Sequence, residues 1–130
     1  MIAKCPLMAF VYTADPEISR PFYRDTLGLK LLEEHQYAMV FDANGTQLRV
    51  GKGSASTPAQ HTVLGWEVPD IGSAINELQA AGVTFNRYEG LGQDEQGVWQ
   101  APGGAKIAWF RDPDGNVLSL TEFPATTPVL

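Results

Sequence analysis

The feature that most constrains the fold of this chain is a repeat in the order of its structural signals. A helix pattern begins with Asp and ends with Gly 13 positions later at Asp15–Gly28 and 12 positions later at Asp70–Gly82. Asn44-Gly45 and Asp114-Gly115 occupy the same hairpin position in the two halves. The chain is therefore predicted to be a duplicated half-domain, even though few residues are identical between the halves.

The first half has the predicted order β-α-β-β-β. Leu7–Thr13 is apolar, β-branched or aromatic throughout, which is typical of a strand covered on both faces. Asp15 as N-cap and Pro16 at the first helical position begin a helix that ends at Gly28. Three more strands are predicted at Leu29–His35, Tyr37–Asp42 and Thr46–Lys52.

The second half repeats this order after a small, polar connector at Gly53–Ala59. A helix from Asp70 to Gly82 places its apolar residues on one face. Strands are predicted at His61–Val68, Val83–Tyr88, Ala105–Arg111 and Asn116–Phe123. We expect one α+β domain, with module one at about residues 5–53 and module two at about residues 60–123.

Composition agrees with one globular domain and excludes some partners. The 130 residues are 44% hydrophobic and 18% charged, which suffices for a packed core. The formal net charge of -6 argues against nucleic acid and membrane surfaces, because both are anionic. The single cysteine, Cys5, cannot form an internal disulfide, so a cytoplasmic location is expected.

Three segments together carry a family resemblance: Asp15–Leu29, Val68–Ile71 with Ala80–Val83, and Phe110–Asn116. In order and spacing they resemble the vicinal oxygen chelate superfamily, which contains glyoxalases, bleomycin-resistance proteins and extradiol dioxygenases. The resemblance implies two β-α-β-β-β modules that form a curved mixed sheet around a small-molecule cavity, often within a homodimer. It says less about chemistry, because one fold can carry many kinds of site.

Metal-dependent members of that superfamily place histidine and carboxylate ligands at positions that can be counted from the matched motifs. Here those positions hold Met8, Arg49, Val63 and Ser119. A thioether, a guanidinium, methyl groups and a hydroxyl do not make the ligand set of a divalent ion. We therefore expect no metal at this position and no cofactor. A displaced metal site that uses His61 is the weaker alternative.

Strand alternation predicts which side chains line a cavity, taking Met8 as the marker of its face. The expected ligand-binding residues are Met8, Phe10, Tyr12, Tyr37, Met39, Arg49, Val63, Glu67, Trp99, Trp109 and Ser119. Trp99 is included because it is a loop residue that could close over a ligand. Phe41 is placed on the same face by the same counting. Such a mainly apolar set is typical of a small-molecule site, although the same aromatic residues could fill a closed core.

The sequence leaves the function open among three classes. The first is a small-molecule-binding protein of the glyoxalase/bleomycin-resistance type, with a preference for cationic ligands. The second is a metal-independent or atypical-metal enzyme, such as a glyoxalase-like lyase or isomerase, with Arg49, Glu67 or Tyr12 as catalytic candidates. The third is a non-catalytic partner domain. Arg49 could bind a ligand anion, or it could pair with Glu67.

Overall fold

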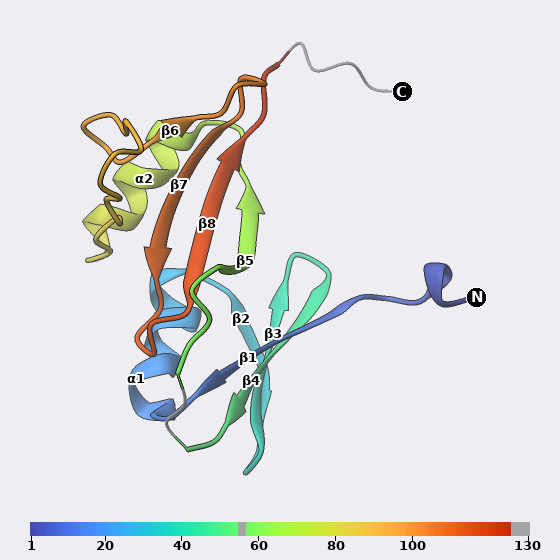
Figure 1. Cartoon of the computed structure of the whole chain (residues 1–130). Coiled ribbons are helices and arrows are strands. Elements are labelled where there is room, and N and C mark those ends of the chain that lie inside the picture. The colour runs from blue at the N-terminus through green and yellow to red at the C-terminus, as the bar shows by residue number, and fades with distance from the viewer. Residues whose placement is uncertain (55–56, 126–130) are drawn as a thin grey trace. The chain divides into compact units, whose positions relative to one another are not determined.

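Each half of the sequence folds into a mixed four-stranded sheet in the computed structural model, which describes residues 1–54 and 57–125 (Figure 1). The two compact units are Met1–Pro58 and Ala59–Leu130. Their strand orders correspond, β1-β4-β3-β2 in the first and β5-β8-β7-β6 in the second, each with one parallel pair. The predicted glyoxalase-like α+β fold of two related modules is confirmed.

The first unit contains one helical region and four strands. Its elements are η1 (Ile2–Lys4), β1 (Met8–Thr13), α1 (Pro16–Pro21), η2 (Phe22–Thr26), β2 (Lys30–Glu34), β3 (Ala38–Ala43) and β4 (Thr46–Lys52). The strand residues that face inward, together with Tyr23 from η2, form its core. The rings of Tyr23 and Phe41 lie 5.8 Å apart at the centre of this core.

The helix of the first unit changes type within its length. Asp15 caps α1 as predicted, because its carboxylate accepts the N–H of Glu17. Pro21 lies inside the helix and has no N–H to donate. The chain continues as the π-helical turn η2, in which the N–H of Leu27 donates to the carbonyl of Phe22 five residues earlier.

The second unit contains β5 (Thr62–Glu67), α2 (Ile71–Ala80), β6 (Trp99–Gln100), β7 (Lys106–Arg111) and β8 (Val117–Glu122). Figure 1 shows α2 along one face of the sheet, where it contacts β7 and β8. Asp70 caps α2 by accepting the N–H of Ser73, as the sequence predicts for this position. Ile71 and Ile75 of α2 are buried in the core of this unit.

The strand predicted at Val83–Tyr88 is wrong. Only Phe85 forms an isolated bridge, to Phe110 of β7. The side chain of Gln93 competes with strand pairing for a backbone group of this segment, because its amide oxygen accepts the N–H of Tyr88 at 2.6 Å. The short strand β6, which the sequence did not predict, pairs with β7 instead.

Among the described residues, no helix is long and apolar enough to cross a membrane.

Candidate functional site

The first sheet has one buried face and one open face. Alternate residues of β1 divide between them: Val11 and Thr13 are 5% and 2% exposed, whereas Phe10 and Tyr12 are 58% and 64% exposed. Met8 lies on the same face as Phe10 and is also exposed. The ladder between β1 and β4 places Arg49 opposite Phe10. We call the side of Met8, Phe10, Tyr12 and Arg49 the open face of the first sheet.

Two residues expected on this open face lie on the buried face. Met39 and Phe41 are fully buried, and they pair with Val50 and Leu48 of β4. Directly paired residues share a face of a sheet. Met39 and Phe41 therefore belong to the core, and the prediction that they line a cavity with Arg49 is wrong.

Arg49 is surrounded by polar groups on the open face. Its Nη1 donates to Oε1 of Gln47 at 3.1 Å, and its Nη2 lies 3.5 Å from Nε2 of His35. The ring of Tyr37, itself 70% exposed, is 6.2 Å from the ring of His35. Within the described ranges, Arg49 makes no ion pair. The pairing of Arg49 with Glu67 stays a prediction.

The second sheet brings several predicted residues to one face. Trp109 and Gly65 both pair with Ser119, and Glu67 pairs with Thr121 two residues further along β8. Ser119 itself is buried, and its Oγ lies 2.8 Å from where a Cβ of Gly65 would stand. Trp99 joins this face from β6, opposite Ile107.

Val63 occupies an irregular position on β5. The register of the β5–β8 ladder shifts between Thr62 and Leu64, so Val63 has no partner in the regular pairing. The alternation argument that placed Val63 on the same face as Glu67 therefore does not apply across this shift.

An apolar pocket of about 450 Å³ lies in the second unit. Aromatic rings from three separate segments meet here. Tyr88 and Trp109 are in an edge-to-face arrangement with ring centres 5.6 Å apart, and Trp99 and Trp109 are 6.2 Å apart. The lining residues are Gln60, His61, Thr62, Tyr88, Leu91, Trp99, Trp109 and Val117. Both predicted tryptophans thus belong to one pocket.

A hydrogen-bonded loop holds Tyr88 at this pocket. The amide oxygen of Gln93 accepts the N–H of Tyr88, while its nitrogen donates to the carbonyls of Asn86 and Gly97. The guanidinium of Arg87 donates to the carbonyl of Asp94 at 2.7 Å and to two neighbouring carbonyls at 3.4 Å. These hydrogen bonds link the two ends of the segment 86–98, which supplies Tyr88 and Leu91 to the pocket wall, and Trp99, expected in a loop, belongs to β6.

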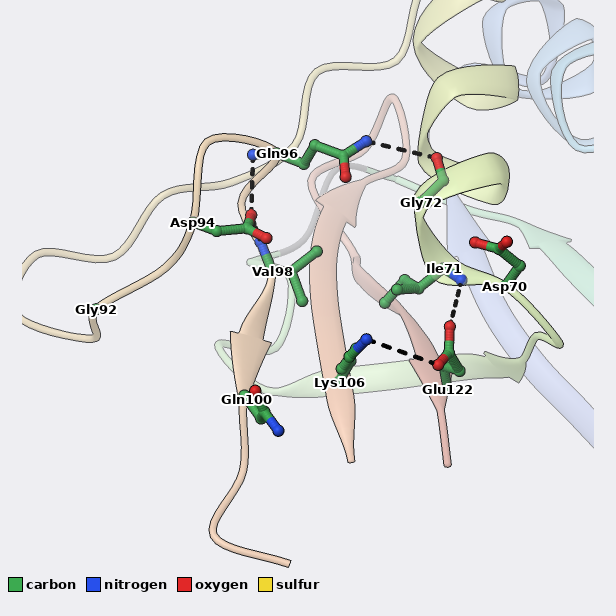
Figure 2. A pocket seen from close by; sticks show the side chains of 10 residues that line it. All are labelled: Asp70, Ile71, Gly72, Gly92, Asp94, Gln96, Val98, Gln100, Lys106 and Glu122. Atoms are coloured by element: carbon green, nitrogen blue, oxygen red, sulfur yellow. Dashed lines mark hydrogen bonds and ion pairs between the residues drawn. The ribbon is translucent and has the colours of Figure 1, made fainter. Parts of the chain in front are cut away.

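A second pocket, of about 400 Å³, lies at the N-terminus of α2 (Figure 2). Most of its polar side chains already have partners within the unit. Glu122 accepts the N–H of Ile71 at 2.8 Å and lies 3.9 Å from Lys106, and Asp94 accepts the N–H of Val98 at 2.9 Å. Gln96 donates to the carbonyl of Gly72. These contacts tie the loop and β8 to the helix, which is a structural role.

The residues at the four positions that the resemblance marks as metal positions do not fit a divalent cation. In the first unit, the positions hold the thioether of Met8 and the guanidinium of Arg49, whose nitrogens are donors only. In the second unit, they hold Val63 and Ser119. Over the residues described, no group of three or more histidine, cysteine or acidic side chains is close enough to bind a metal. The structure gives no basis for metal chemistry at these positions.

The sequence matches the family model of the Glyoxalase/Bleomycin resistance protein/Dioxygenase superfamily over residues 6–120. The match covers most of the chain, so this protein belongs to that superfamily. No curated protein matches the sequence.

Solved structures with the same fold differ in what their names say they do. One is a member of the same superfamily from Sphaerobacter thermophilus DSM 20745, with a TM-score of 0.72 and 23% identity over 94% of this chain and 99% of that one. Another is TnmS3, an antibiotic-binding protein from Streptomyces sp. CB03234, with a TM-score of 0.70 and 22% identity over 95% and 99% of the two chains. A third is a lactoylglutathione lyase from Agrobacterium tumefaciens, with a TM-score of 0.70 and 16% identity over 92% and 93%. At these identities the likeness shows the fold alone.

Several residues that contribute to these surfaces were missed by sequence reasoning, among them Gln60 and Thr62 of the pocket. His35 lies beyond the end of β2, where its N–H donates to the carbonyl of Ala38 and its ring approaches Arg49. Tyr88 and Leu91 come from the loop that was expected to be partly a strand. A tyrosine and a leucine among the glycines of residues 88–92 were the available signal, because exposed loops seldom carry large apolar side chains without a use.

Proposed function

We propose that this chain is a small-molecule-binding protein of the glyoxalase/bleomycin-resistance type that binds its ligand in the apolar pocket of the second unit. The observation that carries the proposal is the group of three rings, Tyr88, Trp99 and Trp109, which line one pocket of about 450 Å³. Pockets of this size with mostly aromatic and apolar walls are typical of small-molecule sites. The aromatic walls favour a flat ligand, which can stack on the face of a ring.

The charge distribution favours a neutral or cationic ligand. Residues 59–130 contain nine Asp and Glu against three Lys and Arg, whereas residues 1–58 contain six of each. The whole formal charge of -6 therefore belongs to the unit that contains the pocket. Faces of tryptophan and tyrosine rings attract cations, and an acidic surround adds to this attraction.

A ligand screen followed by three matched variants tests the pocket. Compounds that raise the melting temperature are retested for quenching of tryptophan fluorescence, with a flat cation and its neutral analogue included. Trp99→Ala and Trp109→Ala should each weaken binding of a confirmed compound about tenfold or more. Phe123→Ala is the control, because Phe123 is an exposed aromatic residue of the same unit outside the pocket. Equal affinities for all variants would contradict the proposal.

Recovery of the bound compound separates a binding protein from an enzyme. We expect the compound to return unchanged after prolonged incubation. Conversion that stops in Glu67→Gln would instead favour the metal-independent enzyme, because Glu67 is an exposed carboxylate on the same sheet face as Trp109.

The proposal includes the absence of a bound divalent metal. Elemental analysis of dialysed protein should show less than stoichiometric zinc, nickel, iron and manganese, because the donors at Met8, Arg49, Val63 and Ser119 do not suit them. A stoichiometric metal that is lost in His61→Ala would contradict this part and support the displaced site.

We also propose a cytoplasmic homodimer. The free thiol of Cys5 is exposed, which suits a reducing compartment. β1 lies at an edge of its sheet and exposes Phe10 and Tyr12, and two-fold dimers are the most common assemblies. Light scattering across a wide concentration range should give a dimer mass, and a constant monomer mass would contradict the assembly.

A further inference from the structure

Both ring nitrogens of His35 face N–H donors on the open face of the first sheet. The N–H of Tyr37 donates to Nδ1 at 3.2 Å, and Nη2 of Arg49 lies 3.5 Å from Nε2. A guanidinium nitrogen can only donate, and a neutral imidazole has one N–H and one acceptor. If Nδ1 accepts from Tyr37, then Nε2 carries the proton, and two donors face each other.

An oxygen acceptor between Arg49 and His35 would resolve this conflict. Two donors 3.5 Å apart can both reach a single oxygen at the usual length of about 2.9 Å. We infer that Arg49 and His35 bind the carboxylate of a small aromatic acid on the open face of the first sheet. This inference is argued from residues of the first unit alone, and it does not depend on the function proposed for the pocket of the second unit.

Arg49 has donors to spare for such a ligand. Of its five N–H groups, one donates to Oε1 of Gln47. Across the residues that the structure describes, the guanidinium has no carboxylate within ion-pair distance. Gln47 also fixes the direction of the guanidinium, so less side-chain freedom is lost when the ligand binds. A charged hydrogen bond to a carboxylate is the strongest interaction open to this group.

Acidic and basic side chains both lie on the face that carries Arg49. The strand register places Glu33 opposite Val40, Asp42 opposite Gln47, and Lys30 opposite Asp42 on the same face. Asp42 accepts the N–H of Gly45 at 2.8 Å. The first unit as a whole has equal numbers of acidic and basic residues, so it does not repel anions as the second unit does.

The aromatic part of the ligand is indicated by the rings beside Arg49. Phe10 is directly opposite Arg49 in the β1–β4 ladder, and it is 58% exposed. Tyr12 follows on the same face, and Tyr37 lies next to His35. Exposed rings gathered around a cation that makes no ion pair with the described residues suit a ligand with a flat apolar body and one carboxylate.

Two probes that differ in charge test this inference with the full-length chain. 2-Naphthoate carries the carboxylate, and 2-naphthamide has the same shape without the charge. We expect the native protein to bind 2-naphthoate about tenfold or more tightly than 2-naphthamide, which corresponds to one or more charged hydrogen bonds. Arg49→Met should abolish this preference, and His35→Phe should reduce it. Arg49→Lys, which keeps the charge but loses the fork of donors, should also reduce it.

A matched control separates specific binding from general attraction. Lys30→Met removes a cation from the same face at the position opposite Asp42, and it should leave the preference unchanged. The preference of the native protein is measured first, and melting curves of all variants show whether each one is folded.

The inference is overturned if the native protein does not distinguish the two probes, or if it binds neither. It is also overturned if folded Arg49→Met or Arg49→Lys keeps the full preference, or if Lys30→Met loses as much of it as Arg49→Met. We expect Trp109→Ala, a variant of the second unit, to keep the preference for 2-naphthoate. This result distinguishes a failure of the Arg49 site from a failure of the proposed pocket.

Nitrogen NMR of labelled histidine gives an independent readout. We expect the proton of neutral His35 on Nε2, with a change in the Nε2 signal when 2-naphthoate is added and little change with 2-naphthamide. A proton on Nδ1, with Arg49 donating to Nε2, would contradict the arrangement.

Discussion

The ring of Tyr12 lies over Gly51, its direct partner in the β1–β4 ladder. A Cβ on residue 51 would stand 2.8 Å from both Cδ1 and Cε1 of that ring. Any side chain at this position therefore displaces Tyr12. The absence of a side chain at Gly51 therefore allows the exposed ring of Tyr12 to occupy its position on the open face.

Gly51→Ala is expected to move the Tyr12 ring while changing stability by less than about 1 kcal/mol. The ring is largely exposed and can rotate outward, and the added methyl group reduces the freedom of the unfolded chain. Ring proton shifts of Tyr12 report the movement. Gly53→Ala is the control, because a Cβ there would meet nothing within 4 Å. Unchanged Tyr12 shifts in Gly51→Ala would contradict the contact.

Glu34 is expected to make the stability of the protein depend on pH. Hydrogen bonds from Arg20 and Lys52 lower the pKa of Glu34 from 4.5 to about 2. Because the pKa in the folded state is below that of the unfolded chain, the stabilisation is complete above pH 4.5. It is lost as the pH falls from there towards about 2.

Glu34→Gln should remove this dependence and lower stability at pH 7 by about 1 kcal/mol, since the charges are partly exposed and solvent screens them. Unfolding in urea at several pH values measures both effects. Glu33→Gln, at the neighbouring residue, changes the net charge equally, and Glu33 makes no ion pair with the residues described here. Similar pH curves for the two variants would contradict the role of Glu34.

Replacing the turn residue Asp112 is expected to lower the free energy of unfolding more than replacing Asp42, its counterpart in the first unit. Its carboxylate is buried and accepts the N–H groups of Asp114 and Asn116 and the side-chain amide of Asn116. Asp42, in the matching hairpin of the first unit, accepts the N–H of Gly45. Asp112→Ala should cost about 2–4 kcal/mol and Asp42→Ala about 1 kcal/mol of unfolding free energy, because a buried group left without a partner costs more. Urea unfolding compares the two, and equal losses would contradict this ranking.

Local signals in the sequence were sufficient for most of the fold. The caps at Asp15 and Asp70 and the two hairpin turns marked a repeated module, because capping and turn chemistry act over a few neighbouring residues. The loop of residues 86–98 could not be predicted in this way. It depends on Gln93 and Arg87, whose side chains bind backbone groups four to eight residues away in the chain.

The candidate site was predicted only in part, because alternation alone does not relate one strand to the next. It placed Phe10 and Arg49 on one face correctly, but it assigned Met39 of β3 to the wrong face of the sheet. The turn at Asn44-Gly45 contained the missing information. A two-residue turn pairs Ala43 with Thr46, and counting outward then pairs Val40 with Arg49, which places Met39 on the other face.

The two methionines, Met8 and Met39, give a direct test of this assignment. Met39 is fully buried in the core, whereas Met8 is 42% exposed on the open face. Met39→Ala should cost about 2–4 kcal/mol of unfolding free energy, because it removes buried apolar surface and leaves a cavity. Met8→Ala makes the same chemical change and should cost less than about 1 kcal/mol, since little buried surface is lost. Urea unfolding of both variants measures the difference. Equal costs, or a larger cost for Met8→Ala, would show that the faces of the first sheet are assigned the wrong way round.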